Sequence, residues 1–74
     1  MKENNKLNVK ELFNLAFQNQ KKKNFNTAIL QYKKIISINP NLALVYYNLG
    51  LIYENLEETA MAKKNYIKSV KVDP

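Results

Sequence analysis

The sequence predicts an all-α fold of four antiparallel helices, arranged as two tandem helical hairpins. Apolar residues recur at the helical spacing of three and four in four successive segments. The 74 residues include one glycine and two prolines, so few positions interrupt a helix, and no segment alternates apolar and polar residues as a strand would. Residues 34 positions apart also match in type, which indicates an internal repeat.

The first helix is expected over residues 9–22. Asn8 stands before it as an N-cap, with Glu11 three residues further on, which is the pattern of a capping box. Lysines 21–23 fall at its end, where positive charge interacts favourably with the helix dipole. Residues 1–8 are polar and without periodicity, so we expect a flexible N-terminal segment.

The second helix is expected over residues 25–38, with Asn24 as its N-cap. Pro40 ends it, because the residue before a proline avoids the α conformation. Its apolar stripe consists of Phe25, Ala28, Ile29, Tyr32, Ile35 and Ile36.

The second hairpin follows the same plan. Asn41 is expected to cap a third helix over residues 42–55. A fourth helix over residues 58–72 begins with acidic residues and ends with Lys68 and Lys71, both of which suit the helix dipole.

Shifting the sequence by 34 positions aligns residues that set helix packing. The aligned pairs are Asn14 and Asn48, Leu15 and Leu49, Ala16 and Gly50, Ala28 and Ala62, Tyr32 and Tyr66, Ile36 and Val70, and Pro40 and Pro74. In the second half the spacing is Tyr46, Leu49, Gly50, Tyr53, Ala62, Tyr66 and Pro74. Gly50 and Ala62 have little or no side chain, so they allow the two helices of this half to approach closely.

This spacing resembles the tetratricopeptide repeat (TPR), with tyrosines in place of its usual tryptophan and phenylalanine. The resemblance implies two repeats, residues 9–42 and 43–74, stacked as a short right-handed α-solenoid. The first repeat departs from the pattern, since Asn19 replaces the expected tyrosine and Ala16 the expected glycine. Terminal repeats are often atypical in this way, because one of their faces has no neighbour.

The resemblance also implies which residues pack the repeats together. These residues are Leu12, Leu15, Ala28, Tyr32, Pro40, Tyr46, Leu49, Gly50, Tyr53, Ala62, Tyr66 and Pro74. Without a capping helix after Pro74, we expect the last hairpin to leave Tyr53, Leu56, Tyr66 and Val70 partly uncovered.

In proteins of this family, the first helix of each repeat lines a concave groove that binds a partner. Carried over to this sequence, the groove residues are Lys10, Phe13, Asn14, Phe17, Leu44, Tyr47, Asn48 and Leu51. The apolar members would accept side chains of a protein segment, while Asn14 and Asn48 would hydrogen-bond its backbone. The alternatives are that a further repeat, the N-terminal segment or a second copy of the chain covers this surface.

The net charge of +6 comes from lysine alone, because the sequence has no arginine. A solvated convex surface explains the lysines, and the alternative is a basic surface that binds nucleic acid or another anionic surface. The absence of arginine counts against nucleic acid, because arginine makes the bidentate phosphate and guanine contacts. The convex lysines are Lys33, Lys34, Lys63, Lys64, Lys68 and Lys71.

No residue pattern for catalysis is present. The serines and threonines have no histidine to activate them, and a single glycine cannot form a phosphate-binding loop. Without histidine or cysteine we expect no metal, no cofactor and no enzymatic activity. The longest mostly apolar stretch, residues 42–53, is too short to span a bilayer, and the start of the sequence lacks a secretory signal, so we expect a cytoplasmic protein.

Overall fold

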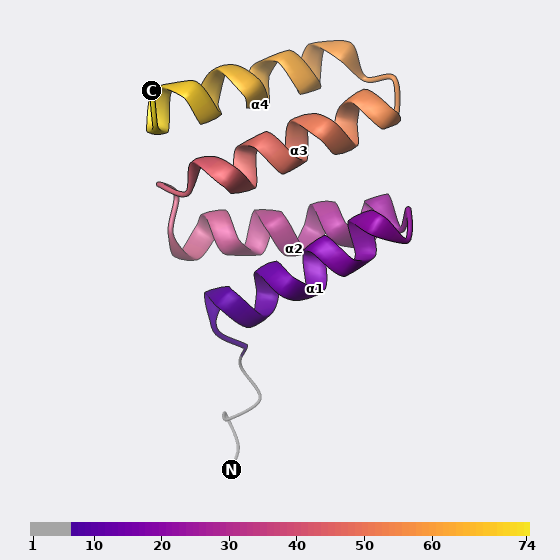
Figure 1. Ribbon diagram of the computed structural model, residues 1–74, viewed down its shortest axis with the longest axis vertical. Coiled ribbons are helices and arrows are strands. Elements are labelled where there is room, and N and C mark those ends of the chain that lie inside the picture. The colour runs from indigo at the N-terminus through magenta and orange to yellow at the C-terminus, as the bar shows by residue number, and fades with distance from the viewer. Residues whose placement is uncertain (1–6) are drawn as a thin grey trace.

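The computed structural model describes residues 7–74 and contains four helices in this part of the chain. They are α1 (Val9–Lys21), α2 (Phe25–Ile38), α3 (Ala43–Asn55) and α4 (Thr59–Val72). Each helix runs antiparallel to the one before it and packs against it, so the four form a single stack from α1 to α4 (Figure 1). The predicted all-α fold is confirmed, and the described residues contain no strand.

The start of α1 is fixed by its capping box. The Glu11 backbone N–H donates to Asn8 Oδ1 at 2.8 Å, and the Asn8 N–H donates to Glu11 Oε1 at 3.1 Å. Two N–H groups near the helix start are thereby satisfied, as the sequence predicted. Of the N-terminal segment expected to be flexible, residues 1–6 lie outside the described residues.

The first helix of each hairpin ends in the same motif, in which a residue other than glycine has the left-handed backbone conformation. Lys23 has φ 67° and Glu57 has φ 61°. After each, the next N–H donates five residues back, from Asn24 to the Asn19 carbonyl and from Glu58 to the Tyr53 carbonyl, both at 2.8 Å. These are Schellman motifs, which satisfy the last carbonyls of α1 and α3.

Of the two further predicted asparagine caps, Asn24 is at the predicted position and Asn41 is not. Asn24 occupies the N-cap position of α2, but its side chain donates to Asn19 Oδ1 and makes no cap hydrogen bond. The N-cap of α3 is Leu42 instead of Asn41. Asn41 is held outside the helix because its N–H donates to Asn39 Oδ1 at 3.1 Å, so a local turn replaces the expected cap.

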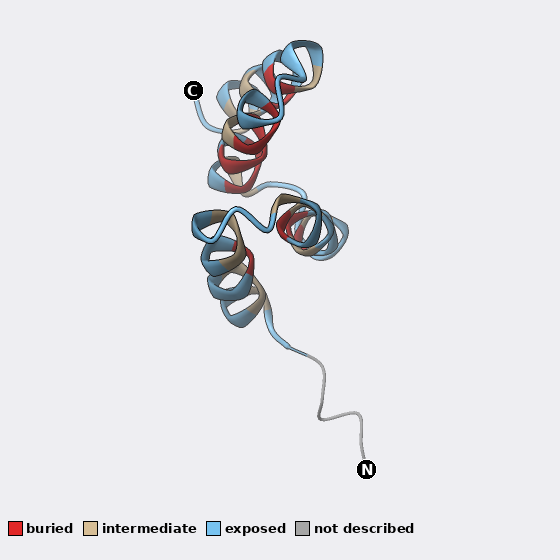
Figure 2. Cartoon of the chain, turned by 90° about the vertical axis from the view of Figure 1, so that its right-hand side faces the viewer, coloured by how far each residue is buried: buried red, intermediate tan, exposed pale blue. Residues whose placement is uncertain are grey.

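The core lies along α3, which packs between α2 and α4 and is the most buried helix (Figure 2). Several predicted packing residues are buried in it: Ala28, Tyr32, Tyr46, Leu49, Gly50, Tyr53 and Ala62. Leu12 and Tyr66 are half-buried against it. Four further core residues, not among the predicted packing positions given above, are Ala16, Ile35, Val45 and Ile52.

Four expectations about packing are wrong. Leu15 is 42% exposed, whereas its equivalent Leu49 is buried, because α3 rests on α2 and no helix of residues 7–74 covers that side of α1. Pro40 and Pro74 are exposed and lie beyond the helices, where they do not pack. Tyr53 is buried instead of partly uncovered.

Hydroxyl groups at the helix junctions donate to groups on the neighbouring segment. Tyr46 donates to the Pro40 carbonyl at 2.8 Å, which fixes the connection between the two hairpins to α3. Ser69 donates to the Ala43 carbonyl at 2.9 Å, which joins α4 to the start of α3. Each such bond contributes about 1 kcal/mol.

Gly50 of α3 lies directly against the Tyr66 ring of α4. A Cβ on Gly50 would lie 2.5 Å from Tyr66 Cε1, so the tyrosine ring occupies the space that a side chain would need. The predicted close approach therefore exists, but its partner is the Tyr66 ring and not Ala62.

Among the described residues, no helix combines the length and the apolar character that crossing a membrane requires.

Candidate functional site

A pocket of about 280 Å³ lies between the start of α1 and the start of α3, and is called here the α1–α3 pocket. It is lined by Val9, Lys10, Phe13, Asn14, Leu42, Leu44 and Val45. Four of these, Lys10, Phe13, Asn14 and Leu44, belong to the surface predicted to bind a partner, and the structure brings them together. The pocket offers apolar walls with one cationic and one amide side chain beside them.

Phe13 forms the inner wall of this pocket through contacts with α2. Its ring meets the Tyr32 ring edge-on, with 5.6 Å between centroids, and stacks on Phe17 at 6.3 Å. Phe17 itself is 41% exposed and carries the Lys21 ammonium 5.5 Å above its ring centroid. Phe17 therefore extends the aromatic surface along α1 without lining the pocket.

Tyr47 and Leu51 were also predicted to bind a partner, and neither lines the pocket. Leu51 is half-buried, whereas Tyr47 is 46% exposed and leans on Tyr66, with 5.7 Å between ring centroids. Tyr47 consequently belongs to the outer surface of the α3–α4 hairpin.

The prediction for Asn48 is wrong. Only 5% of this residue is exposed, so its side chain cannot hydrogen-bond an extended peptide. Its side chain is near the Tyr32 hydroxyl of α2. Burial raises the pKa of Tyr32 to about 12, and a hydrogen bond with the Asn48 side chain acts in the opposite direction. The same hydroxyl donates to Gln20 Oε1 at 2.7 Å. Asn48 thus joins α3 to the first hairpin.

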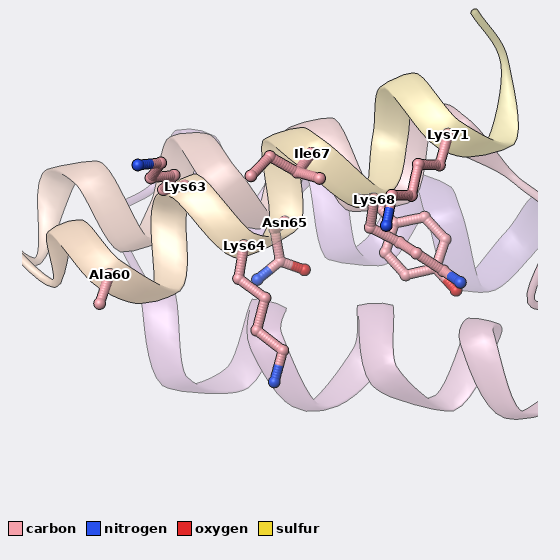
Figure 3. A pocket seen from close by; sticks show the side chains of 8 residues that line it. Ala60, Lys63, Lys64, Asn65, Ile67, Lys68 and Lys71 are labelled. Atoms are coloured by element: carbon pink, nitrogen blue, oxygen red, sulfur yellow. The ribbon is translucent and has the colours of Figure 1, made fainter.

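The second hollow is larger, at about 680 Å³, and runs along α4 beside Tyr46 of α3 (Figure 3). We call it the α4 groove. It is lined by Tyr46, Ala60, Lys63, Lys64, Asn65, Ile67, Lys68 and Lys71. Lys64 and Lys68 project from α4 on the side of the first hairpin, and the Lys68 ammonium lies 5.9 Å above the Tyr46 ring centroid. No carboxylate lines this groove, so its electrostatic potential is positive.

Sequence reasoning identified the four lysines of the α4 groove but not its floor. Tyr46 was assigned to repeat packing, and Asn65 was not singled out. Asn65 is buried, and its side chain donates to the Met61 carbonyl at 2.9 Å. The one sequence feature that could have indicated Asn65 is its position at the edge of the apolar stripe of the helix.

Comparisons with known families agree with the repeat spacing. A family model described as TPR repeat matches residues 21–57, and one described as Tetratricopeptide repeat matches residues 43–74. The two matches together span α2, α3 and α4, while α1 lies almost wholly outside them. No curated protein matches the sequence.

Proposed function

Because the chain belongs to the tetratricopeptide repeat family, whose repeats are generally protein–protein interaction modules, we propose that it binds a segment of a partner protein through its concave surface. The observation that carries this proposal is the α1–α3 pocket. The two helices that line it would be the first helices of repeats 9–42 and 43–74, the position at which this family captures peptides.

The size and lining of the pocket fit one or two apolar side chains of a peptide or helix. Its volume of about 280 Å³ is just below the range for ligand sites, roughly 300–1,000 Å³. Leu44 is 56% exposed at its rim, which leaves apolar area for a partner to cover. Lys10 and Asn14 are exposed beside it and can orient a peptide backbone or a carboxylate.

To test this proposal, binding peptides are selected from a random library displayed on phage. Their affinities are then measured by fluorescence anisotropy. Leu44→Glu places a charge at the pocket rim and should weaken binding by about tenfold. Leu30→Glu is the matched control, since Leu30 is also exposed, at 70%, and lies on α2 away from the pocket. Equal binding by both variants would show that the pocket is not the site.

Self-assembly through the same surface is the competing use of the pocket. Light scattering at two well-separated concentrations measures it directly. A concentration-dependent dimer that Leu44→Glu dissociates would make a second copy the occupant of the pocket, whereas a monomer at both concentrations supports capture of another protein.

The α4 groove supports a second candidate function, the binding of an anionic partner such as single-stranded nucleic acid. Four lysines line it without a carboxylate. With a labelled oligouridylate as the probe, Lys64→Ala combined with Lys68→Ala should reduce the slope of log affinity against log salt by about 1.4. Lys33→Ala with Lys34→Ala removes the same charge from α2, outside the groove, and should leave that slope nearly unchanged. No binding at low salt would exclude this candidate.

A further inference from the structure

Asn65 lines the α4 groove and has hydrogen-bonding capacity that the chain leaves unused. The residue is 9% exposed, and its side-chain N–H donates to the Met61 carbonyl at 2.9 Å. Its oxygen Oδ1 accepts no hydrogen bond from residues 7–74. No side-chain oxygen or nitrogen in this part of the chain is both fully enclosed and unpaired, so Oδ1 is open to the groove. Figure 3 shows the amide between Lys64 and Lys68.

The charge of the groove is positive along its length. Lys64, Lys68 and Lys71 follow one another at positions i, i+4 and i+7, so they leave α4 at intervals of about 4.5–6 Å along the helix axis. Helix α4 itself contains no acidic residue. Glu58 and Asp73 lie just beyond its two ends and do not line the groove. The groove therefore favours an anionic ligand.

The Asn65 amide distinguishes among anionic ligands. It presents the acceptor Oδ1 beside a second N–H donor, and this pair matches the N–H and C=O groups of a peptide backbone. A phosphodiester carries acceptors only, so it would leave Oδ1 unpaired and facing its own oxygens. The amide thus favours a peptide over a nucleic-acid backbone.

A nucleobase could also pair with the amide, but the groove has no surface on which a base could stack. Tyr46 is the one aromatic residue that lines it, and only 7% of Tyr46 is exposed. The Lys68 ammonium lies over the Tyr46 ring, 5.9 Å from its centroid. Binding of single-stranded nucleic acid depends on base stacking against exposed aromatic rings. Both the backbone and the bases of a nucleic acid therefore fit the groove less well than a peptide does.

The dimensions of the groove suit a short extended segment. From Ala60 to Lys71 the helix advances about 16 Å, which an extended chain covers in about five residues. The volume of about 680 Å³ lies within the range of ligand sites, roughly 300–1,000 Å³. Ile67 is 46% exposed and adds an apolar surface for one aliphatic side chain. A segment that combines acidic residues with an aliphatic residue is complementary to these features.

A second copy of this chain does not supply such a segment. Three of its six acidic residues, Glu54, Glu57 and Glu58, gather where α3 ends and α4 begins, and the others are isolated in the sequence. This stretch is already folded, since Glu57 has φ 61° and the Glu58 N–H donates to the Tyr53 carbonyl at 2.8 Å. Extending it would break the Schellman motif that ends α3. The occupant is therefore a segment of another protein.

We propose that the α4 groove binds an extended acidic segment of a partner protein. The Asn65 amide pairs with one backbone peptide unit of that segment, and Lys64 and Lys68 receive carboxylates on either side of it. Ile67 contacts an aliphatic side chain of the segment. This inference rests on the second candidate function, because it names the chemical class of the anionic partner for the same groove.

The probe is a short fluorescein-labelled peptide with glutamates on both sides of a central leucine. Anisotropy against the whole 74-residue chain should show saturable binding. Lys64→Glu combined with Lys68→Glu should weaken that binding by about tenfold or more, because both charges are reversed. Lys33→Glu with Lys34→Glu is the matched control, since it reverses the same charges at exposed positions of α2 outside the groove and should have a much smaller effect.

The contact with the peptide backbone is tested separately. Asn65→Leu keeps the branched shape of the side chain and removes its polar groups, so it should weaken peptide binding by about tenfold. A peptide with N-methylated central amides has no donor for Oδ1. It should lose affinity for the native chain but not for the Asn65→Leu variant, if the two groups are partners. The measurement on the native chain requires no variant to fold.

A labelled oligouridylate in the same buffer separates this inference from the second candidate function. If the oligouridylate binds through Lys64 and Lys68 and the acidic peptide does not bind, the inference is wrong and the second candidate stands. If neither binds, both are wrong. Equal loss in the two charge-reversed pairs, or no effect of Asn65→Leu and of N-methylation, would also overturn the inference. So would a dimer that Lys64→Glu with Lys68→Glu dissociates, because a second copy would then occupy the groove.

Discussion

Replacing Gly50 with alanine tests whether the contact between α3 and α4 depends on the missing side chain. A Cβ there would lie 2.5 Å from Tyr66 Cε1, 2.6 Å from Cδ1 and 2.9 Å from Cζ. These separations are well below the roughly 3.5–4.0 Å at which carbon atoms pack. The ring is held in place by the Tyr47 ring at 5.7 Å and by its hydrogen bond to Glu54 at 2.7 Å. Gly50→Ala must therefore displace either the ring or α4.

Two effects of opposite sign set the magnitude. Overpacking of this kind costs about 1–3 kcal/mol, whereas alanine in place of glycine within a helix gains about 0.5–1 kcal/mol. The net expectation is a loss of about 1 kcal/mol in the free energy of unfolding. For a domain of this length, that loss lowers the melting temperature by about 4–8 °C.

The decisive measurement compares Gly50→Ala in two backgrounds, with thermal unfolding followed by far-UV circular dichroism. In the native background the melting temperature should fall. In a Tyr66→Ala background the ring is absent, so the same substitution should raise the melting temperature through its helix propensity alone. A change of the same sign in both backgrounds would refute the argument that the Tyr66 ring occupies the space beside Gly50.

Three further predictions concern local features. Asn8→Ala removes the capping box with Glu11 and should cost about 1 kcal/mol in urea unfolding, and an unchanged midpoint would contradict the role of the cap. Lys23→Gly and Glu57→Gly relieve left-handed backbone and should each stabilise the chain by about 1 kcal/mol, while lower stability would mean that the side chains are needed at these turns. Burial raises the pKa of Tyr32 from 10.0 to about 12, so the unfolded chain ionises first. The stabilisation from the neutral hydroxyl is complete below pH 10 and is lost as the pH rises toward 12, at up to about 1.4 kcal/mol per pH unit. Unfolding measured against pH should show that decline, and Tyr32→Phe should reduce it, leaving the part that comes from Tyr66, whose pKa is also raised to about 12.

The sequence predicted those features of the fold that depend on near neighbours in the chain. The Asn8 capping box and the apolar stripe of α2 require only residues three or four positions apart, and both are present in the structure. The cap predicted at Asn41 is absent because Asn41 lies in a local turn, in which its N–H donates to the Asn39 side chain and α3 begins after Leu42. Several polar residues close together leave more than one local hydrogen-bonding solution, and residue types alone do not choose between them.

Burial could not be predicted from the repeat, because equivalent residues have different neighbours in the two hairpins. Leu15 and Leu49 are identical in type and position, yet Leu15 is 42% exposed and Leu49 is 2% exposed. Asn14 and Asn48 differ in the same way, since Asn14 lines a pocket and Asn48 is buried at Tyr32. In a stack of hairpins, the presence or absence of a preceding hairpin determines whether such a position packs on a neighbour or stays exposed.

The same reasoning applies to Tyr47, whose position on a first helix predicted a role in the concave groove. In the structure it packs on Tyr66, as Phe13 packs on Tyr32. Phe13 lies in a pocket closed by α3, whereas Tyr47 lies on a surface with no helix above it in the described part of the chain.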